Sequence, residues 1–502
     1  MKSTDKTKTN ELIIGTRGSL LAVTQSTLLK NELESKNPIK LDLKKIKTQG
    51  DQIIDKPLWQ LEGKDFFTKE LDIALLKEEV NFVIHSYKDL GSERPEGIKL
   101  GAITKRKYPH DILLIKKKTI KELSNRQEFI VGTSSPRRIV NTENGLNHYI
   151  AKNAKISCKM LRGNVNSRIE KLINDEYDAI ILAYAGLERL ASYPESAKVL
   201  KELMQDLNFM VLPVKDFPPA SSQGALAVEY SEKFSDQLLP ILETVNCLET
   251  RAVMEKERSI FASYGGGCHL AVGIHTKKVH DYFVTIEKGI SDKKHIFKTY
   301  IEGIDYSILK NKSVYIMNKE NDFLLERQKI VHTPKTSEQS HLFVTSSHCF
   351  HNISNAKTIW SSGNTTMTKL IEAGHWVNGS AEGFGHAEIE NFSNSNLVKI
   401  LYPDINWMVL SHDNASIAFG QLLPSYKHNI INTDGHELVT KLLESEAIYW
   451  ASEIQFKNYI QKYPELEKRT HITGLGKTYT ALKSYKPLPV IDIKHLEKII
   501  KG

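Results

Sequence analysis

The sequence predicts an α/β protein that contains parallel sheets. In the first half of the chain, short apolar segments alternate with segments of helical periodicity, as in βαβ units. Polar residues gather directly after these apolar segments, where open α/β sheets place their ligands. A length of 502 residues allows about three or four domains of ordinary size.

The composition is ordinary for a soluble globular protein and disfavours membrane insertion or export. Hydrophobic residues make up 40% of the chain and charged residues 25%. The longest apolar run, residues 179–187, is too short to span a bilayer. The first ten residues lack the apolar core of a secretory signal. We therefore expect a cytoplasmic protein with no membrane partner.

The net charge and the cysteine spacing argue against nucleic-acid binding, metal binding and disulfide bonds. A formal net charge of +8 is a mild excess, and no dense basic run with interleaved aromatic residues is present, so we expect no nucleic-acid partner. The cysteines have neither metal-ligand spacing nor the density of a disulfide scaffold, so we expect free thiols and no metal. They are Cys158, Cys247, Cys268 and Cys349.

The first predicted elements are a strand over residues 12–16 and a helix over residues 20–34. Arg17 and Ser19 lie in the turn between them, beside a helix N-terminus whose amide groups favour anions. The alternative for Arg17 is an ordinary turn residue. A second strand is predicted within residues 39–48.

A predicted helix over residues 70–79 then leads into a strand over residues 83–86. Strand, helix and strand in this order form a parallel βαβ unit. Lys88 and Asp89 follow at the end of the strand, where a ligand is expected. A lone Lys-Asp pair is more often a solvated turn, so the assignment needs the motifs that follow.

A second α/β unit is predicted from about Pro109 onwards. A strand over residues 129–132 precedes Thr133, Ser134 and Ser135, whose hydroxyl and amide groups at a helix start could hold a carboxylate. Further strands are predicted over residues 156–161 and 178–184.

Five arginines lie at or just past the ends of these strands. Each alone is more often a surface residue, but five at one sheet edge would repel one another unless an anion neutralised them. Guanidinium groups suit carboxylates bidentately, so the pattern predicts a polycarboxylate ligand. They are Arg137, Arg138, Arg162, Arg168 and Arg189.

The next segments predict a return to the first domain and a small third domain. Residues 213–219 form a predicted crossover, and residues 221–229 a strand. A helix over residues 249–264 ends at three glycines, which leave Cys268 on a flexible loop. Strands are expected over residues 270–276, 279–287 and 295–302.

Three of these stretches together resemble hydroxymethylbilane synthase, a family also called porphobilinogen deaminase. They are Gly63-Lys64-Asp65-Phe66-Phe67-Thr68-Lys69-Glu70-Leu71, Val83-Ile84-His85-Ser86-Tyr87-Lys88-Asp89-Leu90, and Val131-Gly132-Thr133-Ser134-Ser135-Pro136-Arg137-Arg138. The resemblance runs from about Leu12 to Glu302. It implies two lobes like those of periplasmic binding proteins, joined by a hinge, and a small α+β third domain.

The implied boundaries are residues 11–108 plus 213–232 for domain 1, 109–212 for domain 2 and 240–310 for domain 3. The resemblance also implies that Cys268 holds one covalent dipyrromethane cofactor per chain through a thioether. The sequence departs from the family pattern at His269, Leu270 and Ala271. This departure affects the expected shape of the loop and not the expected thioether. We expect a monomer.

The resemblance assigns further roles residue by residue. Asp89 is the expected catalytic residue, which would hydrogen-bond the pyrrole nitrogen of porphobilinogen, help ammonia to leave and stabilise the positive charge that develops. The expected cofactor-binding residues are Lys88, Ser86, Thr133, Ser135, Arg137, Arg138, Arg162, Gly163 and Arg168. The expected substrate-binding residues are Arg17, Ser19, Lys64, Phe67, Arg189 and Gln223. For Phe67, a core position at helical spacing is the alternative.

Residues 313–502 form a predicted C-terminal region, which from about Ser313 to Tyr485 resembles uroporphyrinogen-III synthase, the next enzyme of the same pathway, less closely. Two related stretches carry this likeness, residues 343–366 and 448–482, each with a strand, small hydroxyl residues, a second strand and a helix start in which threonine follows glycine after one residue. Cyclisation of hydroxymethylbilane is the implied activity, and a non-catalytic scaffold is the alternative. Candidate residues are Thr345, Ser346, Ser452, Thr478 and Tyr479. For the whole chain, the alternative of another class is a non-enzymatic two-lobed ligand-binding protein.

Overall fold

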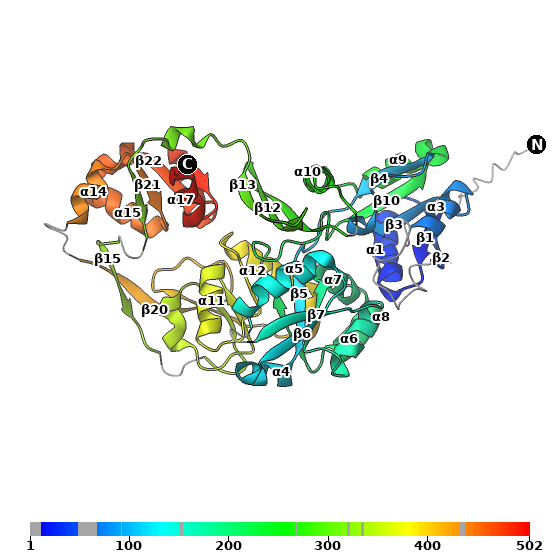
Figure 1. Ribbon diagram of the computed structural model, residues 1–502, viewed down its shortest axis with the longest axis horizontal. Helices are drawn as coiled ribbons and strands as arrows, with labels where there is room; N and C mark the ends of the chain where they lie inside the picture. The colour runs from blue at the N-terminus through cyan, green and yellow to red at the C-terminus, as the bar shows by residue number, and fades with distance from the viewer. Residues whose placement is uncertain are drawn as a thin grey trace, which may run out of the picture. The chain divides into compact units, whose positions relative to one another are not determined.

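The computed structural model (Figure 1) describes residues 12–48, 68–91, 93–150, 154–267, 269–318, 322–332, 336–431 and 437–501. The chain divides into two compact units. Unit 1 comprises residues 1–276, 287–297 and 395–401, and unit 2 comprises residues 277–286, 298–394 and 402–502. Each unit is described by itself below.

The first sheet of unit 1 has the strand order β2-β1-β3-β10-β4. β1 lies parallel to β2 and β3, and β10 lies antiparallel to β3 and β4. Apolar residues of α1 and α9 pack with the sheet in one core cluster, and those of α3 in another. The strands are β1 (Leu12–Arg17), β2 (Leu41–Ile46), β3 (Phe82–Ser86), β4 (Ile98–Ile103) and β10 (Leu226–Ser231), and the helices are α1 (Leu20–Lys36), α3 (Lys69–Leu76) and α9 (Ser235–Glu243).

The second sheet of unit 1 has the order β7-β6-β8-β5-β9. β6 is parallel to β7 and β8, so their carboxyl ends share one edge, while β5 is antiparallel to β8 and β9. The strands are β5 (Asp111–Lys116), β6 (Glu128–Gly132), β7 (Lys155–Lys159), β8 (Ala179–Ala183) and β9 (Leu207–Val211). The helices are α4 (Lys117–Glu122), α5 (Pro136–Gly145), α6 (Val165–Ile173), α7 (Tyr184–Ala191) and α8 (Pro194–Leu203).

The return strand starts later than the sequence pattern suggested. We expected a strand over residues 221–229, but β10 begins at Leu226. Ser222 has φ of +64° and Gly224 has φ of +101°, and a strand does not accommodate these left-handed conformations. A Cβ atom at Gly224 would lie 2.0 Å from the carbonyl oxygen of Lys107, so only glycine fits there.

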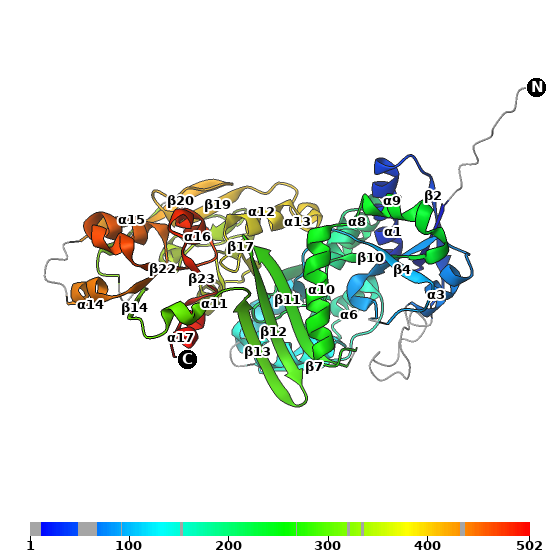
Figure 2. The same ribbon diagram turned by 90° about the horizontal axis from the view of Figure 1, so that it is seen from above.

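A three-stranded sheet follows, with the order β11-β12-β13. Helix α10 (Leu248–Ser263) runs beside β11 (Figure 2), and its apolar residues pack on Val272 and Ile274. The strands are β11 (Ala271–Val279), β12 (Tyr282–Ser291) and β13 (Lys294–Ile301), close to the predicted ranges.

The rest of unit 2 contains two sheets, and the chain visits the first of them twice. β14 (Val314–Met317) enters a four-stranded parallel sheet of order β14-β21-β22-β23, which the chain completes only after residue 446. Its other elements are β21 (Ala447–Trp450), β22 (Thr470–Gly474), β23 (Leu488–Val490), α14 (Leu438–Glu444), α15 (Glu453–Lys462), α16 (Lys477–Ala481) and α17 (Ile493–Lys501).

Between these two visits the chain builds a six-stranded sheet of order β15-β20-β19-β16-β17-β18. Figure 1 shows β15 and β20, an antiparallel pair, running between the two sheets. The strands are β15 (Leu325–Lys329), β16 (His341–Val344), β17 (Thr358–Ser361), β18 (Gly379–Ser380), β19 (Trp407–His412) and β20 (Gln421–Ile430), and the helices are α11 (Asn364–Glu372), α12 (His386–Asn394) and α13 (Asn396–Leu401), the last counted with unit 1.

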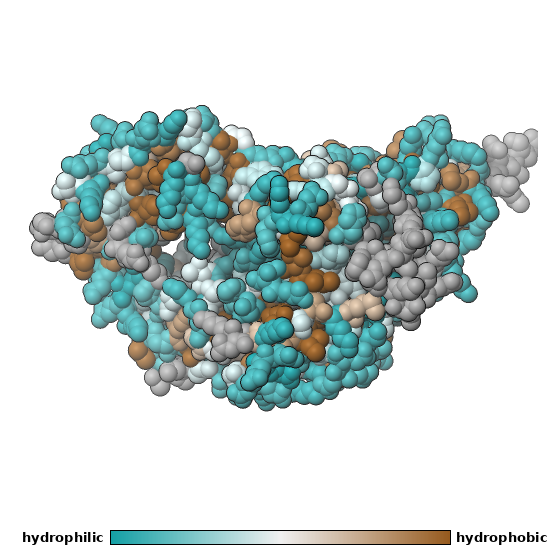
Figure 3. All heavy atoms as spheres, viewed as in Figure 1, coloured by the Kyte–Doolittle hydropathy of each residue, from teal (hydrophilic) through white to brown (hydrophobic). Residues whose placement is uncertain are grey.

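The visible surface is mostly hydrophilic, with apolar side chains in small groups (Figure 3). Within the described ranges, no helix is both long enough and apolar enough to cross a bilayer. The described cysteines, Cys158, Cys247 and Cys349, are free thiols, as predicted.

Candidate active site

Asp89 lies at the carboxyl end of β3, on a one-turn 3-10 helix over Tyr87–Asp89. Tyr87 and Leu90 on either side are buried, while Asp89 is exposed. The amide of Tyr87 donates a hydrogen bond to the carbonyl of Ala225, 3.1 Å away, which fixes the start of this turn to the return strand. The carboxylate of Asp89 is therefore presented from a firmly anchored turn.

Lys88 is half-buried, and its ammonium donates to the side-chain oxygen of Gln223 at 3.3 Å. Removal of the ammonium from water lowers the pKa of Lys88 to about 8, and the nearby Arg138 and Arg137 act in the same direction. The carboxylates of Asp89 and Asp111 oppose this shift. The ammonium of Lys88 therefore lies close to two guanidinium groups as well as to the two carboxylates.

Asp111, at the start of β5, is the internal partner of two predicted site residues. Its carboxylate accepts hydrogen bonds from Arg137 at 2.7 Å and from Arg138 at 2.7 and 3.1 Å. Burial alone raises the pKa of Asp111, but the two guanidinium groups outweigh burial and hold this pKa well below its ordinary value. Sequence reasoning missed Asp111, although an acid that opens an otherwise apolar strand was a usable signal.

A second group of cations follows β7. Arg162 is buried, and Gly163 beside it has φ of +112°. Arg168, on the first turn of α6, donates to the carbonyl of Gly163 at 2.7 Å. Desolvation lowers the pKa of Arg168 to about 10, with help from the charges of Arg138 and Arg162, while Asp89 opposes the shift.

The cations of this site outnumber its anions. Five cations each act electrostatically on at least one other member of a group that also contains Asp89 and Asp111, which leaves an excess of three positive charges among these seven residues. The cations are Lys88, Arg137, Arg138, Arg162 and Arg168. The polycarboxylate ligand that the sequence predicts would offset this excess, and it stays a prediction.

The predicted hydroxyl residues lie near these cations along the chain. Ser86 ends β3, and its hydroxyl accepts from the amide of the Gln25 side chain at 3.3 Å. Thr133 is buried and accepts from the backbone amide of Ser135 at 3.3 Å, just before α5. The side chain of Ser134 bridges to Leu161, which joins the turns after β6 and β7.

Arg17 and Ser19 lie at the end of β1. Arg17 is half-buried. Ser19 caps α1 by accepting from the amide of Ala22 at 3.3 Å. Because β1 is parallel to β3, both residues lie at the same sheet edge as Asp89. Their substrate contacts stay a prediction.

Two predicted substrate residues are buried at the chain crossing, the segment over residues 213–225 that returns the chain to the first sheet. Gln223 belongs to this segment, and Arg189 contacts it. Arg189 donates to the carbonyl of Gly224 at 2.7 Å, and burial lowers the pKa of Arg189 to about 10. Gln223 donates to the carboxylate of Asp111 at 2.9 Å and to the carbonyl of Pro109 at 2.7 Å, while it accepts from Lys88. Their observed contacts hold the crossing together. Lys64, Phe67 and Cys268 lie outside the described residues.

The candidates in unit 2 are tied to local structure. Thr345 donates to the carbonyl of Leu410 at 3.0 Å, and Ser346 and Ser452 accept hydrogen bonds at the starts of their helical turns. Thr478 is half-buried on α16. Tyr479 is 6% exposed, and its hydroxyl donates to that of Tyr282 at 3.2 Å.

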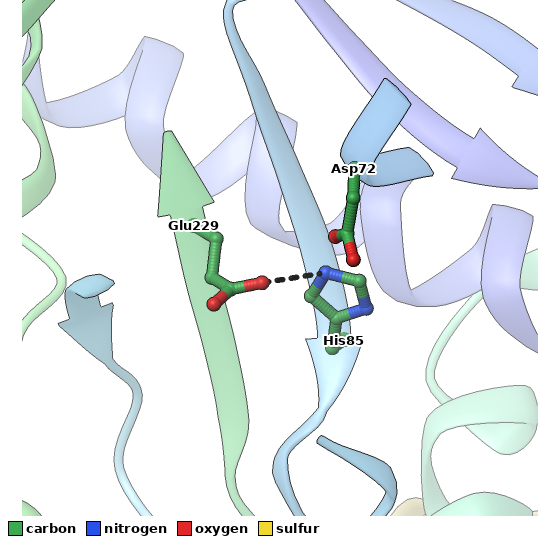
Figure 4. Close-up of side chains that lie close together, drawn as sticks. All are labelled: Asp72, His85 and Glu229. Atoms are coloured by element: carbon green, nitrogen blue, oxygen red, sulfur yellow. Dashed lines mark ion pairs between the residues drawn. The ribbon is translucent and has the colours of Figure 1, made fainter. Parts of the chain in front are cut away.

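A buried cluster beside β3 was also missed by sequence reasoning. Asp72, His85 and Glu229 converge from α3, β3 and β10 (Figure 4), with potential metal-ligand atoms within 4.8 Å of one another. His85 lies 3.2 Å from Glu229, and Arg94 donates to Glu229 at 2.7 Å and to Asp72 at 2.5 Å. Burial raises the pKa of Asp72. The guanidinium of Arg94 thus supplies the cation between the two carboxylates.

The chain is similar to known proteins over the part that carries this site. A family model described as "Porphobilinogen deaminase, dipyromethane cofactor binding domain" matches residues 12–238. The porphobilinogen deaminase of Nitratiruptor sp. is 38% identical over 296 residues, which cover 58% of this chain and 88% of that protein. The porphobilinogen deaminase of Francisella philomiragia is 36% identical over 298 residues, which cover 59% of this chain and 92% of that protein. Among solved structures, a probable extracellular-binding protein of an amino-acid transporter from Bacillus subtilis is 13% identical over 50% of this chain and 96% of its own, with a TM-score of 0.29.

Proposed function

The chain belongs to the porphobilinogen deaminase family, and on this premise we propose that it joins porphobilinogen units head to tail with loss of ammonia and releases hydroxymethylbilane by hydrolysis. The matched part of the chain is the dipyrromethane cofactor-binding domain of that family. When bound, this cofactor is the primer to which the first substrate unit is added. We propose that it is attached through the thiol of Cys268.

The excess of cations around Asp89 is the observation that carries this proposal. Each pyrrole unit bears an acetate and a propionate, so a growing chain brings several carboxylates to one place. Lys88, Arg138 and Arg168 lie in one electrostatic group with Asp89. Half-buried guanidinium groups bind carboxylates more strongly than surface groups do, because water screens them less. The described residues therefore fit the dipyrromethane group and its extensions.

Asp89 has the central role in the proposed reaction. Its carboxylate would accept hydrogen bonds from the pyrrole nitrogen and the aminomethyl group of the substrate, and stabilise the positive charge that develops as ammonia leaves. The same group would accept the proton that is released after each carbon-carbon bond forms. Lys88 and the arginines would hold the acetate and propionate side chains and so orient the pyrrole ring.

Replacement of Asp89 by Asn tests this assignment. Asp89→Asn should lower the rate of ammonia release by about a hundredfold or more, because the amide lacks the negative charge. Thermal unfolding should stay unchanged, since Asp89 is exposed. The control, Asp206→Asn, changes another exposed aspartate on unit 1 and should keep full activity. Full activity of Asp89→Asn would refute the role, and ligand binding without ammonia release by the unmodified chain would favour the non-enzymatic alternative.

We propose a second activity for residues 313–502, the cyclisation of hydroxymethylbilane to uroporphyrinogen III. The two-sheet organisation of unit 2, with a glycine ahead of a helix in each sheet region, supports this proposal. Gly363 precedes α11 and Gly476 precedes α16. A Cβ atom at Gly476 would lie 2.4 Å from the carbonyl oxygen of Gly383, so the loops of the two sheet regions approach each other closely.

Analysis of the product isomer tests this second activity. With porphobilinogen as the only substrate, the full chain should yield mainly the III isomer, whereas spontaneous closure of the bilane gives the I isomer. The double substitution Thr345→Val and Tyr479→Phe should shift the product towards the I isomer without slowing ammonia release. Pure I isomer from the unmodified chain would support the scaffold alternative.

A further inference from the structure

The turn that carries Lys88 and Asp89 is held from outside by one side chain, that of Arg258 on α10. One terminal nitrogen of its guanidinium donates to the carbonyl of Leu90 at 3.0 Å and to that of Tyr87 at 3.5 Å. The other donates to the carbonyl of Gly91 at 2.8 Å. The contacted carbonyls lie on both sides of the Lys88-Asp89 pair, so the guanidinium spans the turn.

The aromatic ring of Tyr87 adds a further contact. The guanidinium carbon of Arg258 lies 4.7 Å from the centre of this ring, which is within the range of a cation-π interaction. Tyr87 is buried, and its own amide is bonded to Ala225. The planar guanidinium is therefore oriented both by the carbonyls and by the ring beside it.

The helix that carries Arg258 is itself fixed in unit 1 by the preceding residue. The carboxylate of Glu257 is fully buried and accepts from Arg106 at 2.7 Å and from the backbone amides of Ser222 and Thr276, each at 2.7 Å. Ser222 belongs to the chain crossing and Thr276 to β11. Because Glu257 holds α10 against both segments, Arg258 can transmit a fixed position to the turn.

We propose that Arg258 is a positioning residue for the reaction, because it holds the Asp89 turn in the orientation that the carboxylate needs. This inference rests on the proposed role of Asp89. Arginine suits the task because its planar fork reaches several acceptors at once, which the ammonium of lysine does not do with the same geometry. A carboxylate displaced by about 1 Å can cost about a hundredfold in rate.

Two variants with a matched control test this inference. Arg258→Met should lower kcat about tenfold to a hundredfold with KM within about threefold, and Arg258→Lys should recover part of the loss. Hydrogen exchange at the amides of residues 88–91 should become at least about tenfold faster in Arg258→Met, while exchange in β10 stays slow. Arg251→Met is the control, because Arg251 lies on the same helix and also acts electrostatically on Tyr87, but donates to Asn246 and to the carbonyl of Gly101 and not to the carbonyls of the turn.

The outcomes separate this inference from the proposed function. If the unmodified chain releases no ammonia from porphobilinogen, the proposed function fails, and the exchange experiment alone decides whether Arg258 holds the turn. If the unmodified chain is active and Arg258→Met matches it in kcat and in exchange, the inference is wrong. Equal losses of kcat in Arg258→Met and Arg251→Met would indicate a merely structural effect and would also overturn it. Intact mass confirms equal primer loading in each variant.

Discussion

Asp89 and Asp111 are carboxylates in one group of cations, but their surroundings give them different tasks. Asp111 is about 1% exposed, and two arginines and Gln223 satisfy its oxygens. Asp89 is exposed at the end of a strand, where a substrate can reach it. Asp111 therefore organises the cations from inside, while the carboxylate of Asp89 stays accessible to solvent.

Asp111→Asn should destabilise the protein strongly. The substitution leaves the guanidinium groups of Arg137 and Arg138 buried without their shared counter-charge, a change that typically costs about 3–5 kcal/mol. Urea-induced unfolding at pH 7 measures the loss. The control is Asp206→Asn, which changes an exposed aspartate on the same unit and should leave the urea midpoint nearly unchanged.

The pH dependence of the same variant checks the cause. Because the arginines depress the pKa of Asp111 in the folded state, its contribution is complete above the unfolded-state pKa of about 4 and is lost as the pH falls towards the folded-state value. The stability gap between the unmodified chain and Asp111→Asn should thus be constant from pH 5 to pH 8 and narrow below about pH 4. A gap that widened in acid would contradict this explanation.

Single site residues could be predicted where their neighbours in sequence carry the signal. Asp89 and Arg137 stand in short motifs, and the local pattern was enough to predict their positions directly after strands, while their roles stay predictions. Asp111 and Gln223 act through partners that are far away in sequence, since Asp111 meets Arg137 across 26 residues and Gln223 across 112. Only the folded chain brings these groups together, so one sequence could not reveal the pairing.

At the scale of elements, Arg94 joins α3, β3 and β10 through the acidic cluster of Asp72, His85 and Glu229. His85 is the last residue but one of β3, the strand that leads to Asp89, so the cluster packs against this strand. Two buried carboxylates this close are stable only with a cation between them. The segment that connects β3 and β4 supplies that cation as Arg94.

Arg94→Met should destabilise the protein and create a site for Zn²⁺. Loss of the guanidinium should cost about 3–5 kcal/mol, because both carboxylates stay buried. With Arg94 removed, one imidazole and two carboxylates offer the ligand types that Zn²⁺ accepts, at distances of about 2.0–2.2 Å after a small shift. Zinc at a hundredfold excess over its Kd should then recover about 2.7 kcal/mol.

Thermal unfolding with and without zinc measures this recovery. The unmodified chain should gain nothing comparable, since Arg94 holds both carboxylates. The double variant Arg94→Met and His85→Gln keeps the carboxylates but loses the imidazole, and should lose the recovery. Equal stabilisation of all three proteins by zinc would show that the metal binds elsewhere.

Element positions followed the sequence well where hydrophobic periodicity governs them, and less well at the crossing. α1 begins at Leu20 as predicted, and β3 matches its expected range within one residue. The expected strand at residue 221 fails because Ser222 and Gly224 adopt left-handed backbone conformations. An apolar run with small residues gives no sign of such a turn, because the close approach to Lys107 that requires glycine is a tertiary contact.

At the scale of the whole molecule, the order of the sheets along the chain was only partly visible. The related stretches around residues 343 and 448 predicted strands that the structure contains as β16 and β21. They gave no sign that β14 belongs to the same sheet as β21. The structure shows this, because the two strands pair in parallel. Strand pairing across more than 130 residues leaves no local pattern, so the interrupted sheet could not be predicted.

Net charge is the remaining whole-molecule property with a functional consequence. The chain carries +8 overall, and the proposed substrate brings two carboxylates to a site with an excess of cations. Salt shortens the electrostatic range from about 10 Å at 0.1 M to about 3 Å at 1 M. It should therefore weaken the approach of the substrate more than the contacts made after binding.

Raising NaCl from about 0.05 M to about 0.5 M should increase KM about threefold to tenfold and change kcat by less than about twofold, because screening acts mainly before the carboxylates reach their partners. Initial rates of ammonia release over a substrate series at each salt concentration measure both constants. Lys88→Met should show a smaller rise of KM with salt, since one cation near Asp89 is gone. Lys441→Met, an exposed lysine on α14, should behave as the unmodified chain does. A KM independent of salt in all three proteins would mean that shape and hydrogen bonds, and not the excess of positive charge, select the substrate.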